Sequence, residues 1–320
     1  DSSTSRGLGD VYKRQAYWSA VNGVPATAFD PSGLMTSMAK TRALSDVSSV
    51  FPLTTAGKPG ILMPHYLELD PKRTDFEDDE DWADAMRGAA GARVDRAIDA
   101  TLMCLPWRMV RDSPYVSQLV ESACASVGGQ YGTHSREIID AVRREGERGA
   151  EIAAMLEARA RMPDGSMIFP ERDEDDEILN RLGRDSLFTL VTMPGLSLPT
   201  TADRDLWTRE EHRAILIASL GWRLAVRNAW ANRSMKTVWV DEMGILMGGF
   251  SSVQSDIVRL AYDTRKYSIS AGFAAQTGGP IQAIDPDIAG IAGTTFLGRS
   301  RGDVSSSLRL LGVEAGHGWE

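Results

Sequence analysis

The sequence predicts an α/β fold in which a large helical segment lies between two groups of strands. Thr237–Val240 is a short apolar run rich in β-branched and aromatic residues, which is typical of a buried strand, and Ser268–Ala275 is a second apolar run. Between them, Ser251–Lys266 has apolar residues at helical spacing behind an N-capping serine. From Ala89 to Gly183 nearly all of the sequence has helical periodicity. Strands and helices are therefore both well represented.

Length, composition and charge limit the number of domains and the kinds of partner that the chain can have. At 320 residues the chain can hold one large or two ordinary domains. No apolar run is long enough to cross a bilayer, which predicts a soluble or membrane-peripheral protein. Cys104 and Cys124 lack metal-ligand spacing, so we expect buried, reduced thiols in a cytosolic compartment. The net charge of −9 argues against a general nucleic-acid binder, because neutralising phosphates needs a basic stripe.

The N-terminal segment Asp1–Gln15 has no apolar periodicity, and we exclude it from the predicted fold. It resembles the translated read-through of a sequencing adaptor at the broken end of a metagenomic reading frame. A disordered polar tail is the alternative. Ala16–Val21 then predicts the stub of a helix, and Ala26–Phe29 predicts a short strand that ends in Asp30. Ser49–Leu53 predicts another strand.

The middle of the chain is acidic and then helical. Asp70–Asp84 is an acidic run that predicts a solvated loop and a helix N-terminus, because it lacks the spaced ligands and glycine of a Ca²⁺ loop. His134 is interpreted as a helix-start residue. Strand character returns at Leu187–Thr192, and Arg209–Asn232 predicts one long amphipathic helix.

Two acids follow the strand Thr237–Val240. In open parallel sheets ligands bind beyond the carboxyl ends of the strands, so Asp241 and Glu242 would lie at that edge. The first acid of such a pair can hold Mg²⁺ through water, and the second can orient and deprotonate an attacking water. The alternative is an ordinary strand end whose acids cap the next helix. Gln276, which closes the neighbouring strand, is well placed to sense a γ-phosphate.

The order of these segments resembles the HerA/FtsK branch of P-loop NTPases, and within it the TraC/VirB-type ATPases of conjugation and type IV secretion. Strand–DE, helix, Arg265-Lys266 and strand–Gln276 carry the core of the resemblance. Four further segments extend it: LFTLVTMPGLSLP (Leu187–Pro199), TTFLGRSRGDVSSSLRLLG (Thr294–Gly312), AFDPSG (Ala28–Gly33) and GILMPHYLE (Gly60–Glu68). Ser32 and Met63 depart from the lysine and asparagine usual in the last two. The resemblance covers the chain from about Ala16 onward.

The resemblance implies a RecA-like core with a mostly parallel sheet, helices on both faces and an all-α insertion. The implied core spans residues 16–69 and 185–320, and the acidic loop and insertion span 70–184. The implied cofactors are ATP and Mg²⁺. Glu242 would be the base and Asp241 the Mg²⁺ partner through water. Gln276 would sense the γ-phosphate, Arg265 would act on a neighbouring subunit, and Asp30 and Arg299 would lie near the nucleotide.

One part of that family pattern is missing. A P-loop requires G-x-x-x-x-G-K-[ST], which cradles phosphates with backbone N–H groups and a lysine. The chain contains no such string, and Gly57-Lys58 is followed by Pro59. We therefore expect an N-terminally truncated fragment whose residues 1–320 do not hydrolyse ATP.

The resemblance also implies partners. An arginine offered to the next subunit implies a head-to-tail ring, and the family suggests a hexamer that works with other secretion components at the cytoplasmic face of the inner membrane. Direct nucleic-acid binding by this fragment is not expected. Two alternatives stay open: a DNA-translocating coupling-type motor of the same superfamily, and a non-catalytic scaffold whose NTPase fold has degenerated.

Overall fold

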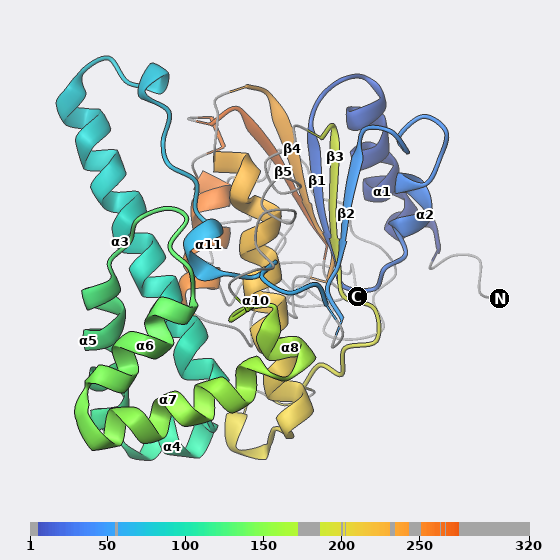
Figure 1. Ribbon diagram of the computed structural model, residues 1–320. Coiled ribbons are helices and arrows are strands. Elements are labelled where there is room, and N and C mark those ends of the chain that lie inside the picture. Colours follow the sequence, from blue (N-terminus) through green and yellow to red (C-terminus); the bar gives the residue numbers. More distant parts are fainter. Residues whose placement is uncertain are drawn as a thin grey trace, which may run out of the picture. The chain divides into compact units, whose positions relative to one another are not determined.

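Figure 1 shows the computed structural model, which describes residues 6–54, 57–171, 186–199, 201, 203–230, 234–242, 251–262, 264–265 and 267–274. The chain divides into two compact units. The α/β unit draws on Asp1–Phe51, Ser186–Thr192 and Arg233–Glu320, and the helical unit draws on Pro52–Asp185 and Met193–Asn232. The strands of the α/β unit therefore come from stretches that are far apart in the sequence.

The α/β unit is built on a five-stranded parallel sheet, which is the fold class that the sequence predicts. The strand order is β2 (Ser48–Pro52), β3 (Phe188–Thr192), β1 (Ala26–Asp30), β4 (Lys236–Val240) and β5 (Ile269–Phe273). β1 is fully buried and pairs in parallel with β3 on one side and β4 on the other. Because parallel strands are covered on both faces, they are buried along their whole length, as β1 and β3 are here.

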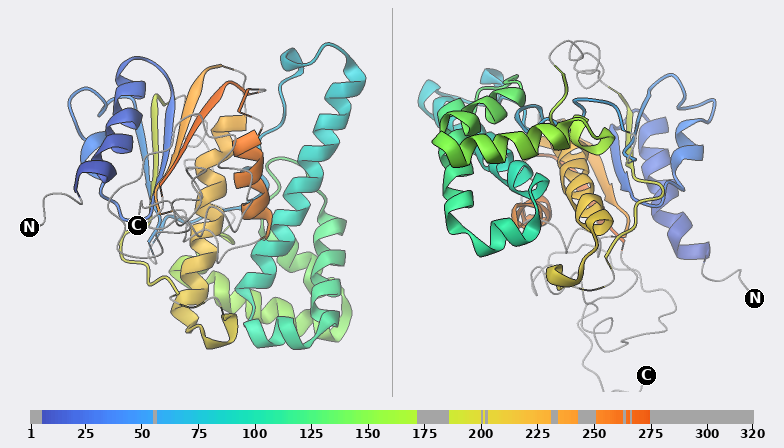
Figure 2. Two further views of the ribbon diagram at one scale, coloured as in Figure 1. Left: turned by 180° about the vertical axis from the view of Figure 1, so that it is seen from behind. Right: turned by 60° about the horizontal axis from the view of Figure 1, so that its bottom comes forward.

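Helices cover the two faces of this sheet. Figures 1 and 2 show α1 (Arg6–Val21) and α11 (Ser251–Tyr262) on opposite faces. On the α1 face, small side chains let the helix approach the strands closely: Ala16 and Ala20 join Ala26 and Ala28 in one buried cluster. The short helix α2 (Thr36–Ala39) adds to the same cluster. α11 buries Val253, Ile257 and Leu260, the apolar positions that its helical spacing predicts.

Helix α1 begins earlier than the sequence predicts. The predicted fold excludes Asp1–Gln15, either as an artefact or as a disordered tail, yet the helix begins at Arg6 and Lys13 within it is 8% exposed. The alternative of a disordered tail is therefore wrong for residues 6–15. Once Ala16 and Ala20 anchor the end of the helix on the sheet, each further residue adds a backbone hydrogen bond, so the helix extends into a segment that has no apolar pattern of its own.

The helical unit contains the all-α insertion that the sequence predicts. Its main helices are α3 (Asp79–Cys104), α4 (Trp107–Asp112), α5 (Pro114–Val127), α6 (Arg136–Arg144), α7 (Gly146–Ala160), α8 (Pro163–Ser166) and α10 (Arg209–Trp230), with 3₁₀ turns η1 (Pro64–Tyr66), η2 (Arg73–Asp75) and η3 (Arg204–Leu206). The bounds of the unit differ from those of the predicted segment 70–184: the unit begins at Pro52 and also includes α10. Among the helices that the structure describes, none combines the length and apolar composition that crossing a bilayer requires.

Acidic residues open α3, as expected for part of the run Asp70–Asp84. The Asp78 side chain accepts a hydrogen bond from the backbone N–H of Asp81, and three acids occupy the first turn. Carboxylates there stabilise the helix because unpaired N–H groups and the helix dipole make the N-terminus positive.

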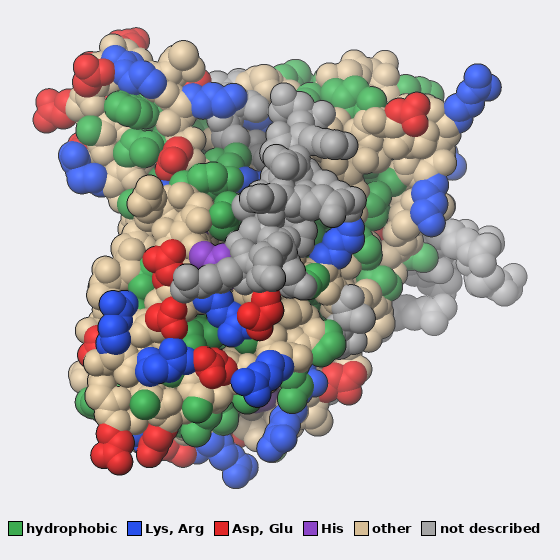
Figure 3. All heavy atoms as spheres, viewed as in Figure 1, with side chains coloured by type: hydrophobic (Ala, Val, Ile, Leu, Met, Phe, Trp, Pro, Cys, Tyr) green, Lys and Arg blue, Asp and Glu red, His purple; other side chains and the backbone are tan. Residues whose placement is uncertain are grey.

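On the surface of α6 and α7, Arg143 pairs with Asp140 and Glu157. Figure 3 shows acidic and basic side chains interspersed on the face in view.

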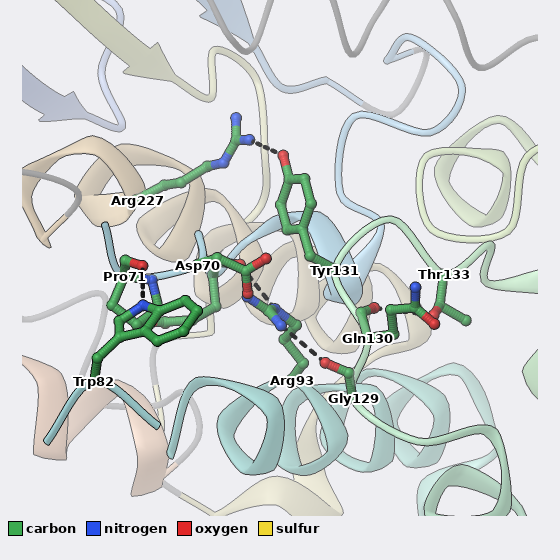
Figure 4. A network of polar contacts seen from close by, with 10 residues as sticks. Asp70, Pro71, Trp82, Arg93, Gly129, Gln130, Tyr131, Thr133 and Arg227 are labelled. Carbon is green, nitrogen blue, oxygen red and sulfur yellow. Dashed lines mark hydrogen bonds and ion pairs between the residues drawn. The ribbon is translucent and has the colours of Figure 1, made fainter. Parts of the chain in front are cut away.

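A buried arginine joins the helices of this unit to the loop after α5 (Figure 4). Arg93 of α3 is 1% exposed. It donates from Nε to the Glu68 carbonyl at 2.9 Å and from Nη1 to the Gly129 carbonyl at 2.9 Å, and its Nη2 pairs with Asp70. Its guanidinium also lies 5.3 Å from the centroid of the Tyr131 ring. One side chain thereby satisfies two backbone acceptors and one carboxylate.

The loop that Arg93 holds lies directly on α3. A Cβ added to Gly129 would be 1.9 Å from the carbonyl oxygen of Ala90, so only glycine allows this approach. Neighbouring side chains hold the same loop: Tyr66 donates to the Gly132 carbonyl at 2.9 Å, and Arg227 of α10 donates to the Tyr131 hydroxyl at 2.6 Å. The loop is thus fixed from α3, η1 and α10 together.

His65 makes the stability of the helical unit dependent on pH. It is fully buried, and its Nε2 lies 2.9 Å from the Gly128 carbonyl, which fits a neutral ring that donates from Nε2. Burial, the largest cause, lowers the pKa of His65 and Arg93 lowers it further, against the hydrogen bond to Gly128, which raises it. In the unfolded chain the pKa is about 6.5. Below that pH the unfolded state binds a proton that the folded state resists, so stability falls as the pH drops.

We expect urea unfolding of the chain to give a smaller free energy at pH 5.5 than at pH 7.5. His65→Gln keeps an N–H donor near Gly128 but does not titrate, so the difference between the two pH values should shrink. An unchanged difference in the variant would show that other groups cause the pH dependence.

Candidate functional site

The carboxyl edge of the sheet brings the ends of β1 and β4 together. Phe29 lies opposite Val240 in the parallel register, and the backbone N–H of Asp241 donates to the Phe29 carbonyl at 2.9 Å. Asp30, the last residue of β1, is therefore beside Asp241, the first residue after β4. Acids that the sequence places more than two hundred positions apart meet at this edge because the strands that carry them are neighbours in the sheet.

Asp30 organises the turn that follows β1. It is completely buried. Its Oδ1 accepts hydrogen bonds from the backbone N–H of Ser32 at 3.1 Å, the Ser32 hydroxyl at 2.5 Å and the Gly33 N–H at 3.2 Å, and its Oδ2 accepts from the Met35 N–H at 2.6 Å. Both oxygens thus serve the turn. These hydrogen bonds explain why position 30 is an aspartate without invoking a bound ligand.

Asp241 and Glu242 are more exposed than Asp30, and Glu242 also has an unusual backbone conformation. Both are half-buried at the edge. The backbone N–H of Glu242 donates to Oδ1 of Asp241 at 3.1 Å, and Glu242 has a positive φ of 53°. Two adjacent carboxylates at a strand end can place an attacking water and, through a second water, a divalent cation.

The other predicted site residues are placed only in part. Gln276 and Arg299 lie outside the described residues. The described chain of β5 reaches Ala274, whose N–H donates to the Val240 carbonyl at 2.8 Å, so β5 ends at the same edge as β4. Arg265 is exposed in the turn that precedes β5, at the amino end of that strand, and its carbonyl accepts from the Ser268 N–H at 3.3 Å. It is therefore not brought together with Asp241 and Glu242 in the same chain.

His134, Cys104 and Cys124 contribute to the fold. Nδ1 of His134 accepts the Arg136 N–H at 3.0 Å at the start of α6, which confirms the prediction of a helix-start residue. Cys124 is buried and Cys104 partly so, both are free, and burial raises the pKa of each thiol to about 12. Within the described parts of the chain, no three His, Cys, Asp or Glu side chains lie close enough to hold a metal ion by themselves.

The structure adds a residue to this edge that the sequence reasoning missed. Thr192 ends β3 directly opposite Asp30 and is 1% exposed. Its hydroxyl has no hydrogen-bond partner within the part of the chain that the structure describes. The signal in the sequence was the same one that drew attention to Asp241: a polar residue that ends an apolar strand.

Comparison with known proteins supports the fold. No protein-family model matches the sequence, and no curated protein matches it. Among solved structures, the chain is similar to VirB4 of Thermoanaerobacter pseudethanolicus, with a TM-score of 0.50 and 15% identity over 87% of this chain and 95% of that one. The two chains share a fold. At this identity the likeness establishes the arrangement of the α/β core. Any chemistry has to be inferred from the residues at the carboxyl edge of the sheet.

Proposed function

We propose that the chain belongs to an ATP-hydrolysing motor that powers conjugative transfer or type IV secretion. The observation that carries the proposal is the pair Asp241–Glu242, which follows a central parallel strand at the carboxyl edge, in a fold shared with VirB4. In parallel α/β sheets this edge is where ligands bind. The pair is half-buried, which leaves it accessible to a ligand while reducing the screening of its charge by solvent.

The residues at the edge fit a nucleotide bound with Mg²⁺. Mg²⁺ uses one or two protein carboxylates together with waters and substrate phosphates, so it does not need the cluster of three ligating side chains that is absent among the described residues. Asp241 would hold the ion through water, and the ion would neutralise charge on the phosphates. Glu242 would orient the attacking water and accept its proton. Gln276 would contact the γ-phosphate, and Arg299 would approach the phosphates from the same side.

The position of Arg265 supports a proposal about assembly. At the amino end of β5 it cannot serve the site of its own chain, so we propose that it reaches the site of a neighbouring copy in a head-to-tail ring, with six copies as the family suggests. The ring would act with other secretion components, peripheral to the inner face of the cell membrane.

Two measurements test the proposal. Residues 1–320 contain no G-x-x-x-x-G-K-[ST] string, so we expect them to show no Mg²⁺-dependent release of phosphate from ATP. The reading frame should then be followed upstream of Ala16 by long-read sequencing of the source DNA, and the longer protein expressed. We expect that protein to carry G-x-x-x-x-G-K-[ST] and to hydrolyse ATP. A frame that begins naturally near Asp1 would instead favour the scaffold alternative, and salt-sensitive DNA binding would favour the translocating motor.

A further inference from the structure

The turn that leads into β5 carries Arg265 and is closed by its own backbone. The Ser268 N–H donates to the Arg265 carbonyl at 3.3 Å, and the Ile269 N–H donates to the Thr264 carbonyl at 2.8 Å. Ser268 has a left-handed φ of 53°, which residues with a side chain rarely adopt. Its carbonyl accepts the N–H of Lys236, the first residue of β4, at 3.0 Å. The end of the turn is therefore joined to β4, while Arg265 within it is exposed.

Tyr267 lies in this turn and is held from two other elements. Lys236 of β4 is 5% exposed, and its Nζ donates to the Tyr267 carbonyl at 2.8 Å. Arg259 of α11 donates from Nη2 to the Tyr267 hydroxyl at 2.9 Å, and its guanidinium lies 5.4 Å from the centroid of the same ring. Through this one residue the turn is attached to both β4 and α11.

The three cations around the turn differ in what they contact. Lys236 and Arg259 both donate to Tyr267, the first to its backbone and the second to its side chain. Among the residues that the structure describes, none forms a hydrogen bond or an ion pair with the side chain of Arg265. An exposed guanidinium without such a contact can bind an anionic group that another molecule supplies.

We propose that Tyr267 is a positioning residue for Arg265: it fixes the turn to β4 and α11, so that the arginine is presented to a neighbouring copy from a defined place. The inference rests on the proposed function in one respect, which is that Arg265 acts on the site of the next copy. An arginine that stabilises charge in a transition state has to be placed accurately, because a displacement of about 1 Å can lower the rate about a hundredfold. Exposed turns open easily, and the contacts of Tyr267 oppose that opening.

Hydrogen exchange of the Ser268 and Ile269 amides in residues 1–320, without nucleotide, tests whether Tyr267 holds the turn. Tyr267→Phe keeps the ring and the carbonyl but loses the hydroxyl acceptor, so both amides should exchange about twofold to fivefold faster. Tyr267→Ala also loses the ring contact with Arg259, and the exchange should be about tenfold faster. Tyr115→Phe, at an exposed tyrosine of the helical unit, is the control and should leave both rates unchanged. Unchanged exchange in both Tyr267 variants would overturn the proposal.

Kinetics of the ATP-hydrolysing protein proposed above test whether the turn positions Arg265. Tyr267→Ala should lower kcat by at least about tenfold and leave KM for ATP within about twofold, because the nucleotide is bound elsewhere. Mixing this variant with Glu242→Gln should restore activity. The mixed ring contains sites in which the intact Glu242 of one variant meets the correctly placed Arg265 of the other. A Tyr267→Ala chain that was merely misfolded would restore nothing.

A second mixture, Arg265→Ala with Glu242→Gln, separates this inference from the proposed function. Recovery in the Arg265→Ala mixture without recovery in the Tyr267→Ala mixture would show that Arg265 acts on its neighbour and that Tyr267 does not position it. This inference would then fail alone. If neither mixture recovers, Arg265 does not act on a neighbouring copy, and the inference fails together with that part of the proposed function. Recovery in both is the expected result.

Discussion

Glu242→Gln is expected to lower kcat for ATP hydrolysis by a factor of about 10² to 10⁴ in the ATP-hydrolysing protein proposed above. The amide has nearly the same shape as the carboxylate but cannot accept a proton from the attacking water. Nucleotide binding should change little, because the phosphates are held elsewhere. The measurements are steady-state phosphate release for kcat and equilibrium titration with a fluorescent ATP analogue for binding.

The matched control for this prediction is Glu147→Gln, at an exposed position at the start of α7 in the helical unit. It removes the same charge away from the edge of the sheet and should leave kcat within about twofold, as expected for a surface substitution. If Glu242→Gln hydrolysed ATP at the parent rate, Glu242 would not be the base. The result would favour the alternative in which Asp241 and Glu242 are acids at an ordinary strand end.

Arg93→Met is expected to lower the free energy of unfolding by about 3 kcal/mol. Methionine fills much of the same volume, so the loss comes from the polar contacts. The carbonyls of Glu68 and Gly129 each lose a donor, and Asp70 loses its cation. A buried acceptor left without a partner costs about 1–3 kcal/mol, whereas Asp70 is partly exposed and regains water.

Urea unfolding at pH 7.5 measures this loss, and Arg87→Met provides the control. Arg87 is on the same helix and also pairs with an aspartate, but its side chain is 70% exposed. Exposed ion pairs contribute little, so we expect a change within about 0.5 kcal/mol. Similar values for the two variants would mean that the buried network contributes no more than a surface pair.

The local elements were predictable because their signals lie within short stretches of sequence. The strand predicted at Leu187–Thr192 is β3, and the helix predicted at Arg209–Asn232 is α10. Both have apolar residues at the spacing of their own type of structure, so neighbouring residues suffice to identify them. Helix α1 was missed in its first ten residues because its stability comes from packing at its other end, which no local pattern reports.

The edge of the sheet was predictable in kind but not in detail. An acid pair after an apolar strand predicts two acids at the carboxyl edge, and the structure places Asp241 and Glu242 there. The sequence could not show that β1 separates β3 from β4, because strand order depends on contacts between distant stretches. It therefore could not bring Asp30 beside Asp241 or place Thr192 opposite Asp30.

The α/β class, the helical insertion and the presence of an acid pair after a strand can be predicted without a structure, since each follows from local periodicity or from adjacent residues. Three features became known only from the folded chain: which strands are neighbours, that α10 belongs to the helical unit, and that Arg93 is buried among backbone acceptors. The left-handed backbone of Glu242 is a fourth. These features share one physical cause: each depends on a hydrogen bond or a packing contact whose partner is brought close only when the chain has folded.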